Sequence, residues 1–448
     1  MKASIGIISH GCPRNMVDSE VMLGALKKEG YSIKEEIGNC DIAIINTCAF
    51  IEDAKQEAID AILQAAELKK EGKIKAIIVT GCLSQRYYKV LEKQIPEIDA
   101  FLGASDFDKI TKAVKDVSEG KKPIIVSHPT KIYSHTSPRF LLTPNYYTYI
   151  KIAEGCNNRC SYCVIYKIRG KYRSRPIESI LKEVENITEN KKISELNIIA
   201  QDTTSYGIDI YGKYKLAKLL ERVATLNKVH WIRLLYTHPR HFSDELIQII
   251  GEKKSICKYI DLPIQHASNR ILKKMNRRIT KSQMQKLIDK IRRKIPDVAL
   301  RTSVIVGFPG ETDKEFKQLL NFIKQIKFER LGAFIYSKEE NTPAYKYKNQ
   351  IPDAIRRQRL DEIMKLQQGI SEQINKSWMN KILEVLIEEK QKNALPAGRQ
   401  DYYIGRSQYD APEVDGVVYV KAKRAKPGDF LKTRITDTLE YDLIGEAI

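Results

Sequence analysis

The chain has 448 residues, enough for two to four domains of about 100–200 residues each, and its 42% hydrophobic residues can bury a sizeable core. Its 76 Lys and Arg against 56 Asp and Glu give a net charge of +20, which suits an anionic partner such as nucleic acid or a ribosomal surface. No run of about 18 apolar residues occurs, which excludes a membrane span, and the first residues lack a signal-peptide core, so we expect a cytoplasmic protein.

Residues 1–120 alternate between apolar runs and amphipathic helix patterns. The runs SIGIIS, IAIINT and AIIVTG lie at residues 4–9, 42–47 and 76–81. This alternation predicts an α/β domain with an open parallel sheet and helices on both faces. Residues 121–146 are rich in proline and have no helical period, so they are predicted to be a linker.

Residues 147–352 hold a second series, in which six apolar runs alternate with helix patterns. Because a complete barrel of this kind has eight β/α units, the series predicts a partial TIM-type barrel. A charged helical pattern over 353–381 links it to residues 382–448, where short runs between turn signals predict a small all-β barrel. The six expected strands are 147–153, 195–201, 230–236, 259–264, 299–307 and 330–336.

Three cysteines follow the first strand of this barrel directly. EGCNNRCSYC spaces Cys156, Cys160 and Cys163 as C-x3-C-x2-C, in a loop at the face of the barrel where active sites collect. A zinc site that lacks one ligand, or buried cysteines without metal, are the alternatives. Three thiolates in eight residues concentrate too much negative charge to stay unmetallated, and three ligands on a 4Fe–4S cluster leave one iron open. That iron can bind the amine and carboxylate of S-adenosylmethionine.

This motif, with an aromatic residue before its last cysteine, resembles the signature of the radical S-adenosylmethionine superfamily. The resemblance implies that the cluster reduces S-adenosylmethionine to a 5′-deoxyadenosyl radical. It also implies that the backbone at Tyr162 contacts the adenine and that the segment TSVIVGFPGET lines the adenosine. Gln201 and Gln265 end the second and fourth strands and face the same mouth of the barrel. Purely structural roles are the alternative. The residues expected around S-adenosylmethionine are Tyr162, Gln201, Gln265, Ser303, Ile305 and Gly307.

The N-terminal domain contains three further cysteines in one shared context. Cys12, Cys48 and Cys82 each lie one to three residues past the carboxyl end of a predicted strand, and in a parallel sheet these ends form one edge. Cys40 and Cys257 precede strands and are predicted not to be ligands. Three unrelated buried cysteines are the alternative. The convergence predicts a second 4Fe–4S cluster with an open iron, able to carry an exogenous sulfur atom.

The whole chain resembles the methylthiotransferase family, which joins a three-cysteine domain, a radical S-adenosylmethionine barrel and a TRAM domain. The resemblance implies that one S-adenosylmethionine methylates sulfur at the N-terminal cluster and another provides the radical that abstracts hydrogen from an unactivated C–H bond. Both clusters must then face one cavity. Nothing demands more than a monomer, and neither the sulfur donor nor the electron donor follows from the sequence.

Several segments distinguish two subgroups of that family. GCPRNMVDSE, QDTTSYG and DLPIQHAS resemble the RimO subgroup, whose target is the β-carbon of an aspartate in the twelfth small-subunit ribosomal protein, free or in the ribosome. The subgroup that modifies a tRNA adenosine usually shows GQNVNSY and LQSGS at the last two places. A ribosomal protein is therefore the expected substrate. A tRNA adenosine methylthiotransferase and a non-catalytic RNA-binding iron–sulfur protein remain the alternatives.

Charge in the tail favours the same substrate. Residues 381–448 hold 11 Lys and Arg against 12 Asp and Glu, whereas a domain that grips tRNA needs a basic face. The acidic loop of Asp410, Glu413 and Asp415 is predicted to dock a basic ribosomal protein, with an ordinary solvated loop as the alternative.

Other features are less decisive. KIRGKYRSR, at residues 167–175, places five basic residues beside the barrel cysteines, where they can neutralise cofactor charge, touch ribosomal RNA or form a solvated loop. His10 and His266 lie near the two cavities, where a structural role and proton handling are the alternatives, and no catalytic residue is assigned beyond the cluster ligands. Tyr166 stands where the family often has proline, and NALPAGRQ at 393–400 resembles an insertion.

Overall fold

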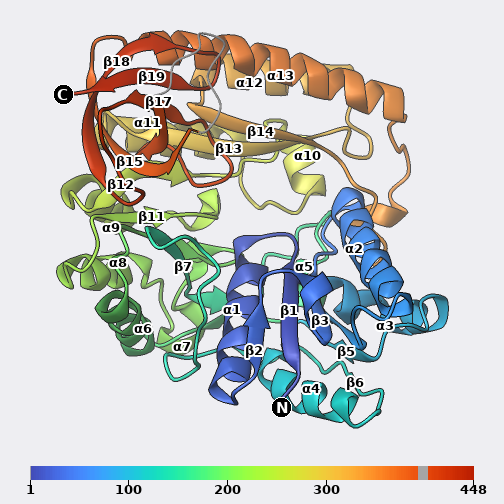
Figure 1. The fold of residues 1–448 in the computed structure, drawn as a ribbon. Coiled ribbons are helices and arrows are strands. Elements are labelled where there is room, and N and C mark those ends of the chain that lie inside the picture. Colours follow the sequence, from blue (N-terminus) through green and yellow to red (C-terminus); the bar gives the residue numbers. More distant parts are fainter. Residues whose placement is uncertain (1, 392–401) are drawn as a thin grey trace.

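The computed structural model describes residues 2–391 and 402–448. An N-terminal parallel sheet, a second six-stranded parallel sheet and a closed C-terminal barrel follow one another along the chain (Figure 1). The long helix α13 (Asp353–Lys376) runs from the second sheet to the C-terminal barrel. A search of the described helices finds none with the length and hydropathy needed to cross a membrane.

The N-terminal sheet has the order β2-β1-β3-β4-β5-β6, and all its pairs are parallel, as predicted. Side chains of β3 alternate: Ile42 and Ile44 pack with α1 and α4, whereas Ala43 and Ile45 pack with α2 and α3. Helices therefore cover both faces. The elements are β1 (Ser4–Ser9), α1 (Pro13–Lys28), β2 (Ser32–Lys34), β3 (Ile42–Thr47), α2 (Glu52–Lys70), β4 (Ala76–Gly81), α3 (Cys82–Gln94), β5 (Ala100–Leu102), α4 (Ile110–Ser118) and β6 (Ile124–Ile125).

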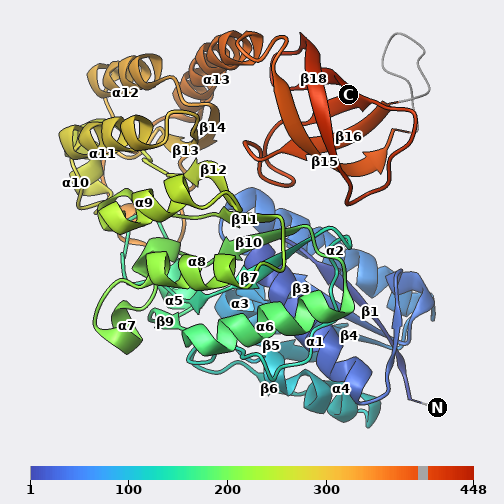
Figure 2. The ribbon, with the colours of Figure 1, turned by 90° about the vertical axis from the view of Figure 1, so that its left-hand side faces the viewer.

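The second sheet has the order β7-β10-β11-β12-β13-β14, so each strand pairs with the next parallel strand of the series, as in a barrel that does not close. Helices cover its outer side (Figure 2). Its strands are β7 (Tyr147–Lys151), β10 (Glu195–Ile199), β11 (Trp231–Leu234), β12 (Ile256–Asp261), β13 (Ala299–Val306) and β14 (Arg330–Ile335). Its helices are α5 (Ile165–Ile168), α6 (Ile177–Asn190), α7 (Ile208–Tyr211), α8 (Leu216–Thr225), α9 (Asp244–Glu252), α10 (Asn269–Lys274), α11 (Lys281–Lys294) and α12 (Asp313–Ile326).

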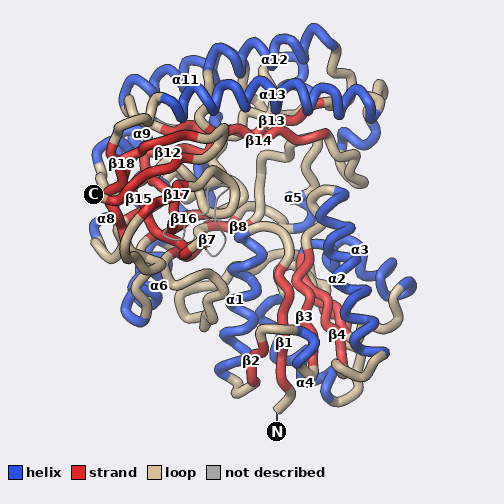
Figure 3. Tube along the Cα trace, turned by 45° about the horizontal axis from the view of Figure 1, so that its top comes forward, coloured by secondary structure: helices blue, strands red, loops and turns tan. Residues whose placement is uncertain are grey.

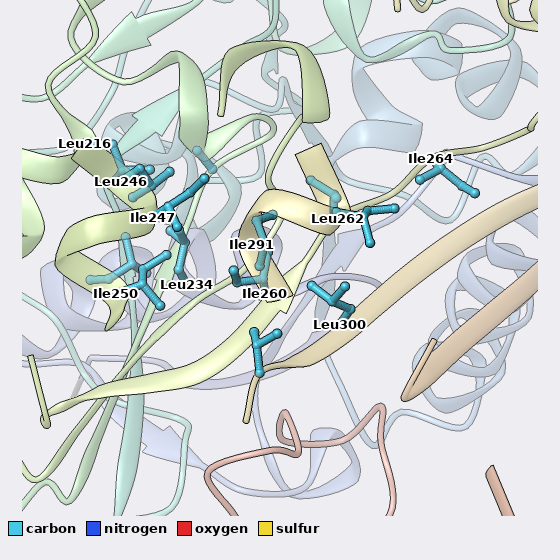
Figure 4. Close-up of a cluster of buried hydrophobic side chains, with 14 of the residues drawn as sticks. Leu216, Leu234, Leu246, Ile247, Ile250, Ile260, Leu262, Ile264, Ile291 and Leu300 are labelled. Atoms are coloured by element: carbon cyan, nitrogen blue, oxygen red, sulfur yellow. The ribbon is translucent and has the colours of Figure 1, made fainter. Parts of the chain in front are cut away.

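The two faces of the barrel strands differ in chemistry. On the outer face, Leu234, Ile260 and Leu300 pack against leucines and isoleucines of α8, α9 and α11 (Figure 4). In β13 the alternate residues Arg301, Ser303 and Ile305 are only half-buried, so they point toward the lumen. A short antiparallel pair, β8 (Ala153–Glu154) and β9 (Arg173–Ser174), follows β7. The outer face therefore builds the core, and the inner face is free for a site.

The C-terminal barrel closes in the order β15-β16-β17-β19-β18 around a small apolar core. The predicted all-β barrel is therefore confirmed, with five strands among the described residues. The predicted insertion at 393–400 lies outside the described residues. The strands are β15 (Ile382–Lys390), β16 (Tyr402–Ser407), β17 (Val418–Lys421), β18 (Phe430–Thr438) and β19 (Leu443–Ala447).

A loop of this barrel, residues 407–415, closes the amino-terminal end of the second sheet. Asp410 forms an ion pair with Arg330, the first residue of β14. Asp415 pairs with Arg301 at 3.3 Å, and the Tyr259 hydroxyl donates to Asp415 at 2.6 Å. Ala411 joins an apolar cluster that also holds residues of β7, β12 and α1. The C-terminal barrel is thus the floor of the central one.

These contacts correct the prediction of an acidic docking loop. The carboxylates of Asp410 and Asp415 are only 2% and 3% exposed, since both are buried against barrel arginines. The exposed Glu413 accepts a hydrogen bond from the Tyr147 hydroxyl at 2.6 Å. Negative charge in this loop joins two domains of the same chain, so the loop is not a free surface for a basic partner.

Candidate functional site

The three N-terminal cysteines lie together at the carboxyl edge of the first sheet. Cys12 caps α1, Cys48 follows β3, and Cys82 begins α3. The loops touch: a Cβ added to Gly11 would lie 2.7 Å from Cys48 Cβ. The Cys82 thiol is 3.8 Å from the side-chain oxygen of Asn15 in α1. The structure therefore brings Cys12, Cys48 and Cys82 to one place, while Cys40 lies at the opposite end of β3.

Cations surround this edge. Arg14 Nε donates to Cys12 Sγ at 3.3 Å, and Arg169 Nη2 lies 3.5 Å from Cys82 Sγ. Burial alone would raise the pKa of the Cys12 thiol, but Arg14 and Arg169 outweigh burial and lower that pKa. Burial, followed by the neighbouring Cys82 and Cys12, raises the pKa of Cys48 to about 12. Three thiolates at this edge therefore need more positive charge than the protein supplies, which a metal cluster provides.

The second set of cysteines lies in the loop that the β8–β9 pair holds at its base. The backbone N–H of Cys156 donates to the Gly170 carbonyl at 3.2 Å, and that of Cys163 donates to the Cys160 carbonyl at 3.0 Å. Burial, followed by the nearby Asp202 carboxylate, raises the pKa of Cys156 to about 12. Arg277 Nη1 lies 3.7 Å from Cys160 Sγ. The loop thus gathers Cys156, Cys160 and Cys163 beside one buried cation.

Gly155, which precedes the first of these cysteines, has a φ of +79°, and a Cβ there would lie 2.2 Å from the Lys171 carbonyl oxygen. We expect Gly155→Ala to destabilise the fold by about 1–3 kcal/mol or more through backbone strain and clash, and to lose iron bound at the barrel cysteines. Thermal melting and iron content measure both effects.

Gly72→Ala is the matched control, because Gly72 also has a positive φ of +72° but nothing within 4 Å of an added Cβ. It should keep full iron content. Equal iron loss in both variants would show that strain alone, rather than closure of the β8–β9 loop, causes the defect.

A buried network joins the two cysteine sets. Arg169 Nη1 donates to Asp18 Oδ2 at 2.6 Å, which connects the barrel loop to α1. Lys151, on β7, forms ion pairs with Asp18 and with Glu154, the latter at 2.6 Å. Gln201 also donates to Glu154. Figure 3 shows β1 and β3 running from the N terminus toward α5 and the barrel. The edge with the N-terminal cysteines therefore faces the barrel mouth.

The residues expected around S-adenosylmethionine divide into two groups. Tyr162 and Ile305 pack against the same buried cluster, and the Gln265 backbone bonds to Ser303 and Ile305 at 2.9 and 2.8 Å. Gln201 instead lies on the side of the network with Glu154. The Cα of Gly307 faces the Arg356 side chain. The structure thus brings together Tyr162, Gln265, Ser303 and Ile305, with Gly307 just past the end of the same strand, whereas Gln201 bonds to Glu154 of the buried network.

The basic segment 167–175 is largely internal. Arg169 and Arg175 are 2% and 1% exposed, and Arg175 pairs with Glu183. For these two arginines the solvated and RNA-facing interpretations are wrong, whereas Lys167 and Lys171 are exposed. Tyr166 and Lys167 line a surface pocket of about 500 Å³ with residues 340–346.

The two histidines have structural partners. His10 Nδ1 lies 3.0 Å from Glu57, and His266, fully buried, accepts from the Ser268 N–H at 2.9 Å and lies 3.5 Å from Glu311. These bonds hold the two rings in fixed orientations.

Several polar residues between the two cysteine sets were not among the predicted site residues. Lys151 had a signal, because it is a charged residue inside the apolar run YTYIKIA. Arg14 and Asp18 fall in an ordinary amphipathic helix pattern and gave none. These residues neutralise charge between the two cysteine sets, and they appear only when the two domains are placed together.

The donor set fits an iron–sulfur cluster better than a single ion. Within residues 2–391 and 402–448, no three His, Cys, Asp or Glu side chains are arranged to hold one metal ion. In a 4Fe–4S cluster each cysteine binds a different iron, so its ligands stand further apart than around one ion. Two sets of three thiols beside Arg14, Arg169 and Arg277 match that chemistry.

Three families match the chain. Residues 4–103 match the family described as "Uncharacterized protein family UPF0004", residues 150–323 the radical SAM superfamily, and residues 381–448 the TRAM domain. The radical SAM methyltransferase TsrM from Kitasatospora setae, with cobalamin and a [4Fe-4S] cluster bound, has a TM-score of 0.56 at 14% identity, covering 77% of this chain and 74% of that chain. That likeness shows the fold.

Curated relatives match nearly the full length. "Ribosomal protein uS12 methylthiotransferase RimO" of Desulforamulus reducens is 50% identical over 445 residues, 99% of each chain. The protein of the same name from Clostridioides difficile is 47% identical over 445 residues, 99% of this chain and 98% of that one. By this identity and coverage, the chain belongs to the RimO-type methylthiotransferases of the radical SAM superfamily.

Proposed function

We propose that this protein adds a methylthio group to the β-carbon of an aspartate in ribosomal protein uS12. The relatives that cover it end to end carry that ribosomal protein in their names. The observation that carries the proposal is that the two three-cysteine sets lie on either side of one buried network, in which Asp18 pairs with Lys151 and Arg169. Because both cysteine sets belong to one chain, we propose that the protein acts as a monomer, and the ribosomal target supports a cytoplasmic reaction.

Radical SAM membership implies a 4Fe–4S cluster and S-adenosylmethionine. We assign one cluster to Cys156, Cys160 and Cys163, with S-adenosylmethionine beside Tyr162, Ser303 and Ile305, and a second cluster to Cys12, Cys48 and Cys82. When bound, these groups supply the electron, the carbon-centred radical and the methylated sulfur.

The chain's own residues hold and insulate these groups. Gly155 turns the barrel loop, and Arg14 and Arg169 place positive charge at the N-terminal thiols. On the floor of the chamber, Tyr149 and Tyr259 are buried against the loop 407–415. The side chains of the protein thus orient the reactants and keep water from the reacting C–H bond.

Mass spectrometry tests the proposal. Purified uS12, assembled small subunits and total tRNA are incubated anaerobically with the reconstituted enzyme, S-adenosylmethionine, sulfide and dithionite as reductant. We expect one methylthio group on a uS12 aspartate. A methylthio group on tRNA alone would show a tRNA adenosine methylthiotransferase, and absence of 5′-deoxyadenosine would show a non-catalytic iron–sulfur protein.

A further inference from the structure

Arg14 lies beside Cys12 and has no carboxylate partner among residues 2–391 and 402–448. Its Nε bonds Cys12 Sγ at 3.3 Å and its Nη1 bonds the Ala200 carbonyl at 2.9 Å, while the guanidinium stacks 4.3 Å from the ring centroid of Tyr236. Nη2 has no hydrogen-bond partner among the described residues, and the side chain is only half-buried. One edge of the guanidinium therefore remains open to the chamber.

Three other cations near the cysteines and the barrel floor, Arg169, Lys151 and Arg301, already form ion pairs with carboxylates. Arg169 pairs with Asp18, and Lys151 pairs with Asp18 and Glu154. Arg301 pairs with Asp261 at 3.1 Å and with Asp415. These carboxylates cannot turn to Arg14 without leaving another buried cation unpaired, which costs several kcal/mol. Arg14 therefore has a free Nη2 edge that a carboxylate from outside can reach without displacing an existing ion pair.

Arg277 also lacks a carboxylate partner within the described residues. It lies beside Cys160 and donates to the Pro263 carbonyl at 2.6 Å, which is the side of the chamber assigned to S-adenosylmethionine. Arg14 lies on the opposite side, beside Cys12, where the methylthio group would be delivered. Of the two arginines, Arg14 is therefore placed for the acceptor.

We propose that Arg14 binds the side-chain carboxylate of the acceptor aspartate and so selects an acidic side chain. This inference rests on the proposed function and deepens it. When Nη2 binds the aspartate carboxylate, the β-carbon, which is bonded directly to the carboxyl carbon, is held close to the N-terminal thiols. Tyr236 and Ala200 fix the guanidinium plane, so little side-chain freedom is lost on binding.

Binding of two peptides tests this directly. One is a uS12 peptide with the unmodified acceptor aspartate, and the other has asparagine at that position. Affinities are measured anaerobically with the reconstituted holoenzyme, for wild type, Arg14→Gln and the surface control Arg222→Gln. We expect wild type and the control to bind the aspartate peptide on the order of tenfold tighter or more, and Arg14→Gln to bind both about equally.

Each outcome is decisive. An Arg14→Gln enzyme that keeps the wild-type preference overturns the inference. If that variant loses iron, the wild-type enzyme still tests the inference. Equal affinity of the wild-type enzyme for the aspartate and asparagine peptides also overturns it. Arg14→Lys, which keeps the charge without the planar fork, should retain a reduced preference. Absence of any methylthio group on uS12 would instead reject the proposed function and not the geometry of Arg14.

Discussion

Cys160→Ala is expected to abolish 5′-deoxyadenosine formation, whereas Cys48→Ala is expected to keep it and to lose methylthio transfer. The two cysteines lie on different domains, and each set has its own backbone support, so loss of one cluster need not disturb the other. Chromatographic assay of 5′-deoxyadenosine, beside mass analysis of uS12, separates the two losses.

Cys257→Ala is the control, since Cys257 lies inside β12 at the floor of the barrel, remote from both sets. It should leave iron content and both activities unchanged. If Cys48→Ala also stopped 5′-deoxyadenosine formation while its barrel iron remained, the assignment of separate tasks to the two sets would fail.

Asp18→Ala should give the largest loss of stability among single substitutions at the domain interface. Its carboxylate is shared by Lys151 and Arg169, both buried, and its removal leaves Arg169 with one ion pair among the described residues, the longer 3.4 Å contact to Glu154. Breaking a buried pair of this kind costs about 3–5 kcal/mol. In calorimetry the N-terminal domain is expected to melt earlier than the rest, as a separate transition.

Asp108→Ala removes a comparable ion pair, with Lys131, in which both side chains are more than 40% exposed. Because solvent screens that pair, the expected change is about 0–1 kcal/mol. Similar melting curves for the Asp18 and Asp108 variants would mean that the buried network does not hold the domains together.

Much of the fold and the position of the cysteines could be predicted because both depend on local pattern. The apolar runs of β1, β3 and β4 match the strands residue for residue, so the cysteines that follow them had to share one edge. β12 begins three residues earlier than predicted, at Ile256, because its pairing with β11 sets the start. It ends at Asp261, before Pro263, which has no N–H for the ladder.

The predictions that were wrong or missing concern residues whose structure depends on contacts distant in sequence. Asp410 and Asp415 have the composition of a solvated acidic loop, and only the docking of the C-terminal barrel supplies Arg330 and Arg301 as partners. β6 has two residues, too few for any periodicity, and exists by pairing with β5. Arg14 likewise has the same sequence context as a surface arginine. Long-range neighbours decide such cases, and one sequence does not encode them locally.

The floor formed by the loop 407–415 has a consequence for engineering. Ala411 packs against the aromatic residues at the amino-terminal end of the central barrel, and Asp415 accepts a hydrogen bond from Tyr259 there, so the TRAM domain closes that end of the barrel. Deleting the TRAM domain would expose Tyr259 and the neighbouring aromatic residues at this end of the barrel to solvent. A chimaera that borrows this domain from a tRNA-modifying relative must therefore also transplant the barrel residues that meet the loop, or leakage will mask any change of target.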